Sequence, residues 1–188
     1  MQILAVENPQ QLELALAVRF EVFVTEQGVG EDAEQDHLDT DPRTLHCLVI
    51  ADAEDALGGG VVPGLAPGFA AGVFPGLPLA TGRLLAPHTD SAHGEGTAHG
   101  AMDPGVPHIG RVAVMREARG TGAGRAVMAF LEAAALERYG SGGEVRVELS
   151  AQDQAMPFYE KLGYTAFGEG YLDEGIEHHD AFKVIRAR

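Results

Sequence analysis

Apolar residues gather in short runs along the chain, with spacings that indicate strands separated by helices. The runs that predict strands lie at residues 1–7, 46–52, 79–86, 109–115, 144–150 and 181–187. The run at 144–150 has the most regular pattern, because Val145, Val147 and Leu149 alternate with polar residues and so share one face of an extended chain.

A helical period separates the first two predicted strands. Residues 11–24 place Leu12, Leu16, Phe20 and Phe23 on one helical face. The acidic segment that follows, 25–43, predicts a second, short helix and a loop.

Two further helices are predicted in the second half. The helix at 124–140 ends at Gly140, and the shorter one at 153–164 is closed by Gly163. The inward positions of the first of these are Val127, Leu131, Ala134 and Ala135. Strand, helix, strand, helix, strand is an α/β order, in which helices cover a sheet.

The length of 188 residues and the 45% hydrophobic content predict one domain, 1–188. Two segments interrupt the periodic pattern, near 55–79, which is rich in Gly and Pro, and at 87–108, which is polar; both predict loop insertions. Four histidines lie in or at the end of the second loop: His88, His93, His99 and His108. Their spacing matches no known ligand pattern, so we expect no metal.

The charge of the chain narrows the classes of partner. With 28 acidic and 13 basic residues the formal net charge is −15, which disfavours nucleic acid and anionic membranes. The same charge suits a cationic amine, although solubility alone also explains it. No apolar run is long enough to cross a membrane and the start lacks a secretory signal, which predicts a cytoplasmic protein. The single cysteine, Cys47, is expected to pack in the core.

A glycine-rich loop, "REARGTGAGRAVM" at 116–128, stands between a predicted strand and a predicted helix. Such a loop commonly holds phosphate at a helix N-terminus. Counted from Gly120, both the dinucleotide fingerprint and the P-loop require glycine at 125, where Arg125 stands. What remains is R-x-x-G-x-G, formed by Arg119, Gly122 and Gly124; by itself it is also compatible with a plain glycine-rich turn.

About thirty residues further on, the chain reads "QDQAMPFYEKLGY", with Gln152, Ala155, Phe158, Tyr159 and Tyr164 at the spacings of a second motif. The two motifs together resemble the GNAT superfamily of acyl-CoA-dependent N-acetyltransferases, with Gln152 where relatives usually have Asn. The segments "RFEVFVTEQGV", "EQDHLDTD", "ATGRLL" and "YLDEGIEHHDAF" resemble the ElaA/YjcF-like branch. The implied fold is α/β (α+β): a mixed, mostly antiparallel, splayed sheet flanked by helices.

The resemblance also implies an acetyl-CoA site. The pantetheine arm would lie between the strands at 109–115 and 144–150, bonded by the backbone of Val112, Ala113 and Val114, one of whose N–H groups would hold the oxyanion. Gln152 and Phe158 would complete the site, although Phe158 also suits the core. The pyrophosphate would be held by the loop residues Arg119, Gly120, Thr121, Gly122, Ala123, Gly124 and Arg125, where side chains at Gly122 and Gly124 would block its approach.

The chemistry implied is direct attack of an amine on the thioester. Tyr159 would protonate the departing thiolate, or would simply pack in the core. Many relatives carry a glutamate base near 111, but Arg111 stands there and cannot act as a base at neutral pH. The remaining candidates are His178 and His179, predicted just before the last strand, with His179 favoured by its spacing to Phe182; either could instead be a solvated turn residue.

Acidic residues near the first helix are the other candidates on the amine side: Glu26, Asp36 and Asp39. They would bind a cationic acceptor, or cap and solvate this region. The leading function is acetyl transfer from acetyl-CoA to a primary amine that is a small molecule. The alternatives are an inactive acyl-CoA sensor and a nucleotide-binding regulatory module, and the sequence leaves open whether the chain is a homodimer.

Overall fold

The structure, a computed structural model, describes residues 1–51, 76–87 and 102–187. Its residues fall into two compact units. The N-terminal unit comprises Met1–Arg83 and Arg111–Leu131, and the C-terminal unit comprises Leu84–Gly110 and Glu132–Arg188. Most of the predicted loops near 55–79 and 87–108, with His88, His93 and His99, lies outside the described residues. No helix among the described residues is both long and apolar enough to span a bilayer.

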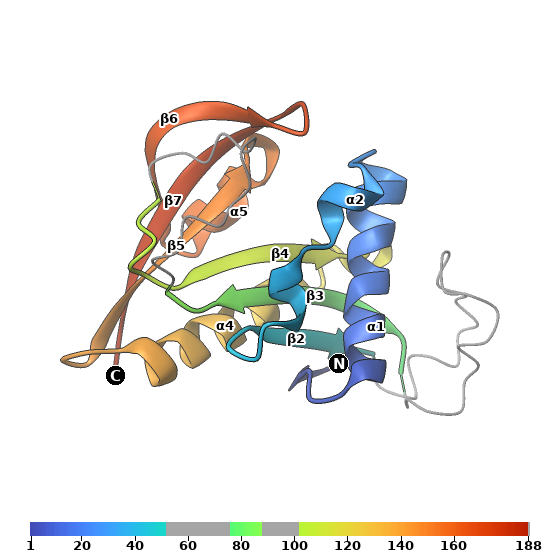
Figure 1. Cartoon of the computed structure of the whole chain (residues 1–188), viewed down its shortest axis with the longest axis horizontal. Coiled ribbons are helices and arrows are strands. Elements are labelled where there is room, and N and C mark those ends of the chain that lie inside the picture. The colour runs from blue at the N-terminus through green and yellow to red at the C-terminus, as the bar shows by residue number, and fades with distance from the viewer. Residues whose placement is uncertain (52–75, 88–101, 188) are drawn as a thin grey trace. The chain divides into compact units, whose positions relative to one another are not determined.

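The strands of the described residues form one mixed sheet with the order β1-β2-β3-β4-β5-β7-β6 (Figure 1). They are β1 (Gln2–Ala5), β2 (Leu45–Ile50), β3 (Pro78–Leu85), β4 (His108–Val114), β5 (Glu144–Gln152), β6 (Thr165–Asp173) and β7 (Ile176–Arg186). The pairs β1–β2, β5–β7 and β6–β7 are antiparallel, whereas β4 and β5 are parallel, joined at His108 and Glu148. The predicted mixed sheet is therefore confirmed.

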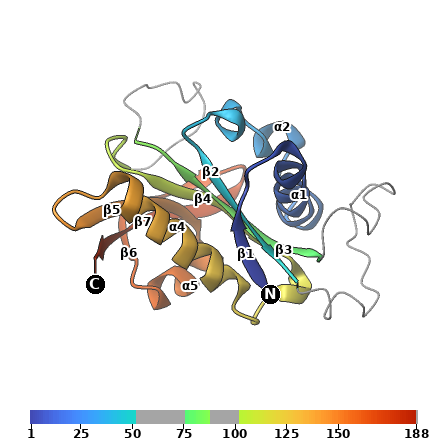
Figure 2. The same cartoon turned by 90° about the horizontal axis from the view of Figure 1, so that it is seen from below.

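The first helix of the N-terminal unit packs on β1 and β2 (Figures 1 and 2). α1 (Pro9–Arg19) begins with Asn8 as N-cap and Pro9 in the first turn, a favoured start. It continues without a break as a π-helical segment, η1 (Phe20–Glu26). The buried stripe is not the predicted one: Leu12, Leu16, Phe20 and Phe23 are only half-buried. The fully buried residues are Leu14, Ala15, Val18, Arg19 and Val22, which include an arginine that no apolar pattern reveals.

Short helices follow in the predicted acidic segment: α2 (Glu31–Glu34) and the 3-10 turn η2 (His37–Thr40). The long helix α4 (Ala123–Tyr139) is preceded by the 3-10 turn η3 (Arg116–Ala118). The predicted inward residues of α4 are buried. Gly82 in β3 is needed for this packing, because a Cβ there would lie 2.6 Å from Val127 and 2.9 Å from Leu131.

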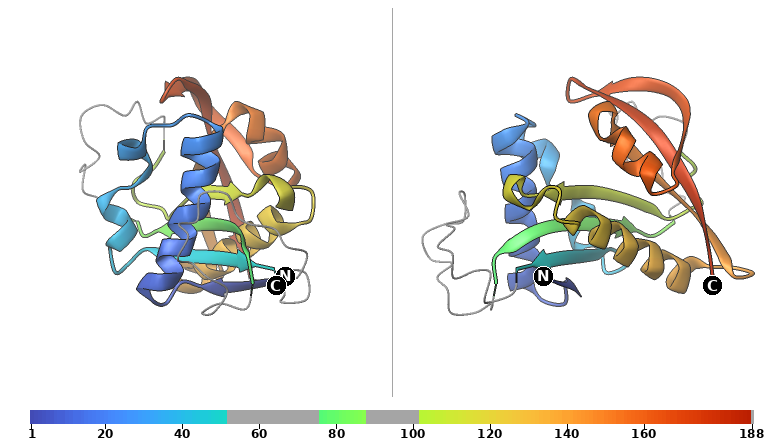
Figure 3. Two further views of the ribbon diagram at one scale, coloured as in Figure 1. Left: turned by 90° about the vertical axis from the view of Figure 1, so that its right-hand side faces the viewer. Right: turned by 180° about the vertical axis from the view of Figure 1, so that it is seen from behind.

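In the C-terminal unit, β5, β7 and β6 form an antiparallel sheet with the 3-10 turn η4 (Asp153–Ala155) and α5 (Met156–Lys161) beside it (Figure 3). The predictions of β5 and of the helix closed by Gly163, whose φ is +91°, are confirmed. β6 was not predicted, because its residues are mostly exposed and lack a clear apolar alternation. The last strand is also longer than predicted.

The register of β7 corrects the placement of the two histidines. His178 and His179 lie inside β7, opposite Gln152 and Ala151 of β5, and not before the strand. Because successive side chains of a strand point to opposite faces, the two imidazoles belong to different faces of the sheet.

Candidate functional site

The glycine-rich loop has a backbone conformation suited to binding an anion at the N-terminus of α4. Gly120 and Gly122 have φ of +79° and +98°, which other residues adopt only with strain. A Cβ on either glycine would have no atom within 4 Å, so the loop leaves space at both positions. The amide of Ala126 donates to Gly122 O, so Gly122 caps α4 and the first helical N–H groups have no partner within the helix. This arrangement fits a pyrophosphate.

Arg119 at the start of this loop is held by an acidic residue from η1. Its two terminal nitrogens donate to the two carboxylate oxygens of Glu26 at 2.7 Å each, and its Nε donates to Val114 O at 3.2 Å. The hydrogen bond from Arg119 lowers the pKa of Glu26. A carboxylate with a lowered pKa is a weak base, so this pairing favours a role for Glu26 in holding Arg119 rather than in proton transfer.

Strand β4 contains a backbone conformation that is rare for its residue type. Arg111 has φ of +52°, in the left-handed region, which costs a non-glycine residue about 1–2 kcal/mol. A residue of this kind interrupts the regular ladder and changes the direction of the groups that follow it. Those groups are the backbone of Val112, Ala113 and Val114.

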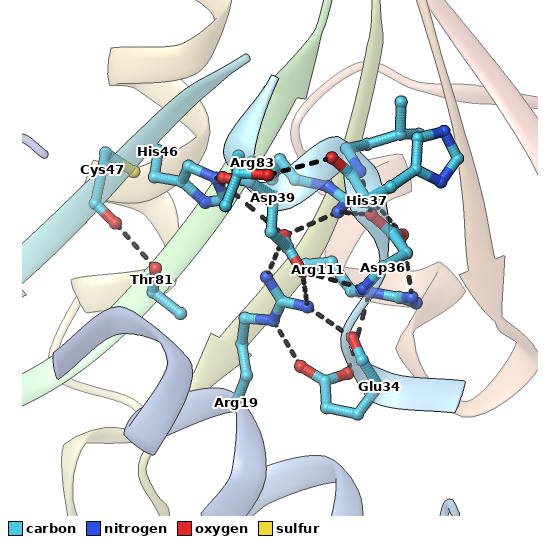
Figure 4. Close-up of polar contacts among 12 residues, drawn as sticks. Arg19, Glu34, Asp36, His37, Asp39, His46, Cys47, Thr81, Arg83 and Arg111 are labelled. Carbon is cyan, nitrogen blue, oxygen red and sulfur yellow. Dashed lines mark hydrogen bonds and ion pairs between the residues drawn. The ribbon is translucent and has the colours of Figure 1, made fainter. Parts of the chain in front are cut away.

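A charge cluster surrounds the Arg111 side chain in the N-terminal unit (Figure 4). We define it as Arg19, Glu34, Asp36, Asp39, Arg83 and Arg111, three cations and three anions. Arg19 is fully buried; it donates to Glu34 and, at 2.6 Å, to Asp39. Arg83 donates to both carboxylate oxygens of Asp36 at 2.8 and 2.9 Å and to Asp39 at 2.7 Å. Each buried charge therefore has an opposite charge beside it.

The pKa values follow from these pairings. Burial alone would raise the pKa of Asp39, but the hydrogen bond and charge of Arg19, with the charge of Arg83, hold it far below its usual value. Arg83 likewise outweighs burial and lowers the pKa of Asp36. Burial raises the pKa of Glu34 despite Arg19 and Arg111. Asp36 and Asp39, candidates for the amine side, are thus tied to arginines.

Tyr159 lies in α5 of the C-terminal unit, with 8% of its surface exposed. Its ring makes edge contacts with Phe158 and Tyr164, at centroid distances of 5.1 and 5.9 Å. Burial raises the pKa of Tyr159 to about 12. The phenol therefore stays protonated at neutral pH, as a proton donor must be.

The two histidines of β7 have different partners. Nδ1 of His179 lies 2.6 Å from a carboxylate oxygen of Asp153, and Nδ1 of His178 lies 2.9 Å from the carbonyl oxygen of Ile176. Since both partners accept, Nδ1 carries the hydrogen in each ring and Nε2 keeps its lone pair while the ring is neutral. The His179 ring lies over Gly170, where a Cβ would be 2.8 Å from Nε2. The His178 ring stacks on the ring of Tyr171, and the two ring centroids lie 6.1 Å apart.

A third polar group, not found from the sequence, lies on the His178 face. Tyr171 donates to the buried Asp180 at 2.8 Å and is also hydrogen-bonded to Ser150. The only signal in the sequence is an aspartate at the start of the mostly apolar run "DAFKVI", and that signal is weak without knowledge of β6.

Gln152 ends β5 and accepts a hydrogen bond from Gln154 at 2.9 Å. Gln152 and Phe158 lie with Tyr159, His178 and His179 in the C-terminal unit, whereas the loop residues, Glu26 and the end of β4 lie in the N-terminal unit. Of the four loop histidines only His108 is described; its Nε2 bonds to the carbonyl of Asp103 at 2.9 Å. The described part of the chain contains no group of three or more His, Cys, Asp or Glu side chains suited to a metal. Burial raises the pKa of Cys47 in β2 to about 12, which keeps its thiol protonated.

Comparisons with known proteins concern the family and the fold of the chain. Residues 91–183 match the Acetyltransferase (GNAT) domain family. Over 184 residues the chain is 29% identical to the Bacillus subtilis protein called Uncharacterized N-acetyltransferase YjcF, covering 97% of this chain and 99% of YjcF.

Two solved structures extend the likeness to the whole fold. An acyl-CoA N-acyltransferase from Pseudomonas aeruginosa has a TM-score of 0.66 and 26% identity, covering 97% of this chain and 98% of that chain. Escherichia coli ElaA has a TM-score of 0.66 at 20% identity, with 97% and 99% covered. The fold class and the resemblance drawn from the two sequence motifs are confirmed.

Proposed function

This chain carries a GNAT acetyltransferase domain, and from that premise we propose that it transfers an acetyl group from acetyl-CoA to a primary amine. The observation that carries the proposal is the loop before α4, where Gly120 and Gly122 are left-handed and a Cβ on either would meet no atom within 4 Å. The loop fits a pyrophosphate, and its spacing fits neither of the two nucleotide fingerprints.

In the proposed reaction the neutral amine nitrogen attacks the thioester carbon. The new C–N bond forms, the C–S bond breaks, and a backbone N–H of Val112, Ala113 or Val114 stabilises the oxyanion of the tetrahedral intermediate. Holding the two reactants together supplies much of the rate. Tyr159, whose phenol is protonated at neutral pH, gives its proton to the thiolate and regains one from solvent.

A histidine of β7 takes the proton that the attacking nitrogen releases. We assign this role first to His179, because the Asp153 carboxylate fixes its Nδ1–H and stabilises the imidazolium that forms. His178 is the second candidate, with a carbonyl in place of the carboxylate. Glu26 is a weaker third candidate, because Arg119 lowers its pKa.

The acceptor is proposed to be a small amine, and a cationic one is favoured by the formal net charge of −15. The alternative is an acyl-CoA sensor without turnover. The observation that favours it is Arg111 at the position where many relatives have a glutamate base.

Calorimetry tests the donor first. Wild-type protein titrated separately with acetyl-CoA, ATP and NAD is expected to bind acetyl-CoA alone, and absence of acetyl-CoA binding would refute the proposal. Release of free CoA across a panel of primary amines then separates the enzyme from the sensor: a sensor binds acetyl-CoA but releases no CoA with any amine.

A further inference from the structure

Two described residues other than glycine have left-handed backbones, and they differ in setting. Glu174, with φ of +48°, lies in the tight turn between β6 and β7, where this conformation is ordinary. Arg111, with φ of +52°, lies inside strand β4. A strained backbone inside a strand persists only where its surroundings hold it.

The Arg111 side chain contacts the acidic segment around α2. Its Nη2 donates to the carbonyl oxygen of Ala33 at 3.0 Å and lies 3.4 Å from Asp36 Oδ2. Its Nε lies 3.7 Å from a carboxylate oxygen of Glu34. All three partners belong to the short segment formed by α2 and the residues just after it.

These partners are themselves fixed. Glu34 is held by the fully buried Arg19, and Asp36 receives both terminal nitrogens of Arg83. The guanidinium of Arg111 is therefore fastened to a part of the charge cluster that does not depend on Arg111 for its own position (Figure 4).

We infer that Arg111 is a positioning residue: its side chain ties β4 to the α2 segment, holds the left-handed kink, and so sets the direction of the Val112–Val114 backbone. This inference rests on the proposed function, in which that backbone bonds the arm of acetyl-CoA. At position 111 the chain therefore has no base. It has an arginine whose side chain links β4 to the α2 segment and affects the substrate only through the backbone of the strand.

The test compares glycine with alanine at position 111. Arg111→Gly and Arg111→Ala remove the same charge and the same contacts, so both lower the unfolding temperature. Only glycine adopts the left-handed backbone freely, whereas alanine leaves it for ordinary strand geometry. Because apparent affinity falls with the fraction of competent conformer, the dissociation constant for acetyl-CoA, measured by calorimetry, should be about tenfold weaker for Arg111→Ala than for Arg111→Gly.

Glu174 provides the matched control. Glu174→Gly and Glu174→Ala make the same comparison at the other left-handed residue, and the two should bind acetyl-CoA alike. A purely structural role for Arg111 predicts equal affinities of Arg111→Gly and Arg111→Ala despite their lower unfolding temperatures, and that result would overturn the inference. Failure of the wild-type protein to bind acetyl-CoA would overturn the proposed function, and this inference with it; wild-type binding with equal variants overturns this inference alone.

Discussion

The charge cluster of the N-terminal unit and the histidines of the C-terminal unit are both polar groups fixed by hydrogen bonds, but their partners differ. In the cluster three arginines meet three carboxylates, and Arg19 is fully buried. On β7 each imidazole has one partner on Nδ1, and the side chains of His179 and Asp153 are each 39% exposed. Removing one charge from the buried cluster leaves its partners short of an opposite charge and destabilises the fold, whereas a ring that keeps a lone pair is able to move a proton. Substitutions in the two regions should therefore change different measurements.

The largest expected effect lies on β7. His179→Ala should lower kcat by about 10²- to 10⁴-fold, the usual contribution of a general base, and remove the acid limb of the pH–rate profile. Stability should change little, as measured by thermal unfolding. Gly170→Ala offers a second variant, since its Cβ would displace the His179 ring and should lower kcat without removing the imidazole.

His178→Ala is the control for that prediction, because it removes the neighbouring ring from the opposite face of the strand. If His178→Ala abolishes the acid limb and His179→Ala leaves it intact, the base is His178 and the assignment to His179 is wrong.

The next largest effect should appear in the charge cluster. Arg19→Met removes the buried guanidinium that Glu34 and Asp39 share, and should cost about 3–5 kcal/mol of unfolding free energy, measured by urea denaturation. Arg43→Gln removes an exposed ion pair with Asp41 and should cost no more than about 1 kcal/mol. Equal losses in the two variants would show that the cluster is not a structural unit.

The same cluster predicts a pH dependence. The pKa values of Asp36 and Asp39 are lowered in the folded protein, so their contribution to stability is complete above the unfolded value near 3.8 and is lost as the pH falls toward the folded values. Unfolding free energy measured from pH 6 downward should therefore fall in acid, and less steeply in Asp39→Asn. A slope unchanged by this substitution would contradict the assignment.

Tyr159→Phe should have a smaller effect than these substitutions, and the quantity that changes should be kcat. Loss of the phenolic proton donor is expected to lower kcat at least tenfold, about 1.4 kcal/mol, and to leave the dissociation constant for CoA nearly unchanged. The ring contacts with Phe158 and Tyr164 survive this change, so the unfolding temperature is the control. An unchanged kcat would leave Tyr159 as a packing residue only.

The smallest effect should come from Glu26, which has features of both regions. It is partly exposed and paired with Arg119 beside the glycine-rich loop. Glu26→Gln should weaken acetyl-CoA binding by no more than about fivefold, as expected for a surface pair, and leave kcat unchanged. A loss of kcat comparable to that of His179→Ala would instead make Glu26 the base.

The sequence predicted those parts whose signal is local. β5 and α4 followed from apolar spacing, and the glycine-rich loop followed from the spacing of Arg119, Gly122 and Gly124 between a strand and a helix. The charge cluster did not, because Arg19, Glu34 and Arg83 are far apart in the chain and look like surface residues until the fold brings them together. β6 was missed because its residues are mostly exposed, and the Tyr171–Asp180 bond was missed with it.

The central claim is acetyl transfer, and following the labelled acetyl group tests it most directly. Wild-type protein is incubated with acetyl-CoA carrying a ¹³C-labelled acetyl group and with each amine of the panel in turn. The masses of the products are then measured by mass spectrometry. The account predicts a labelled N-acetyl product with at least one amine, formed together with an equal amount of free CoA and reduced at least tenfold in Tyr159→Phe. Binding of acetyl-CoA without a labelled product from any amine would contradict it.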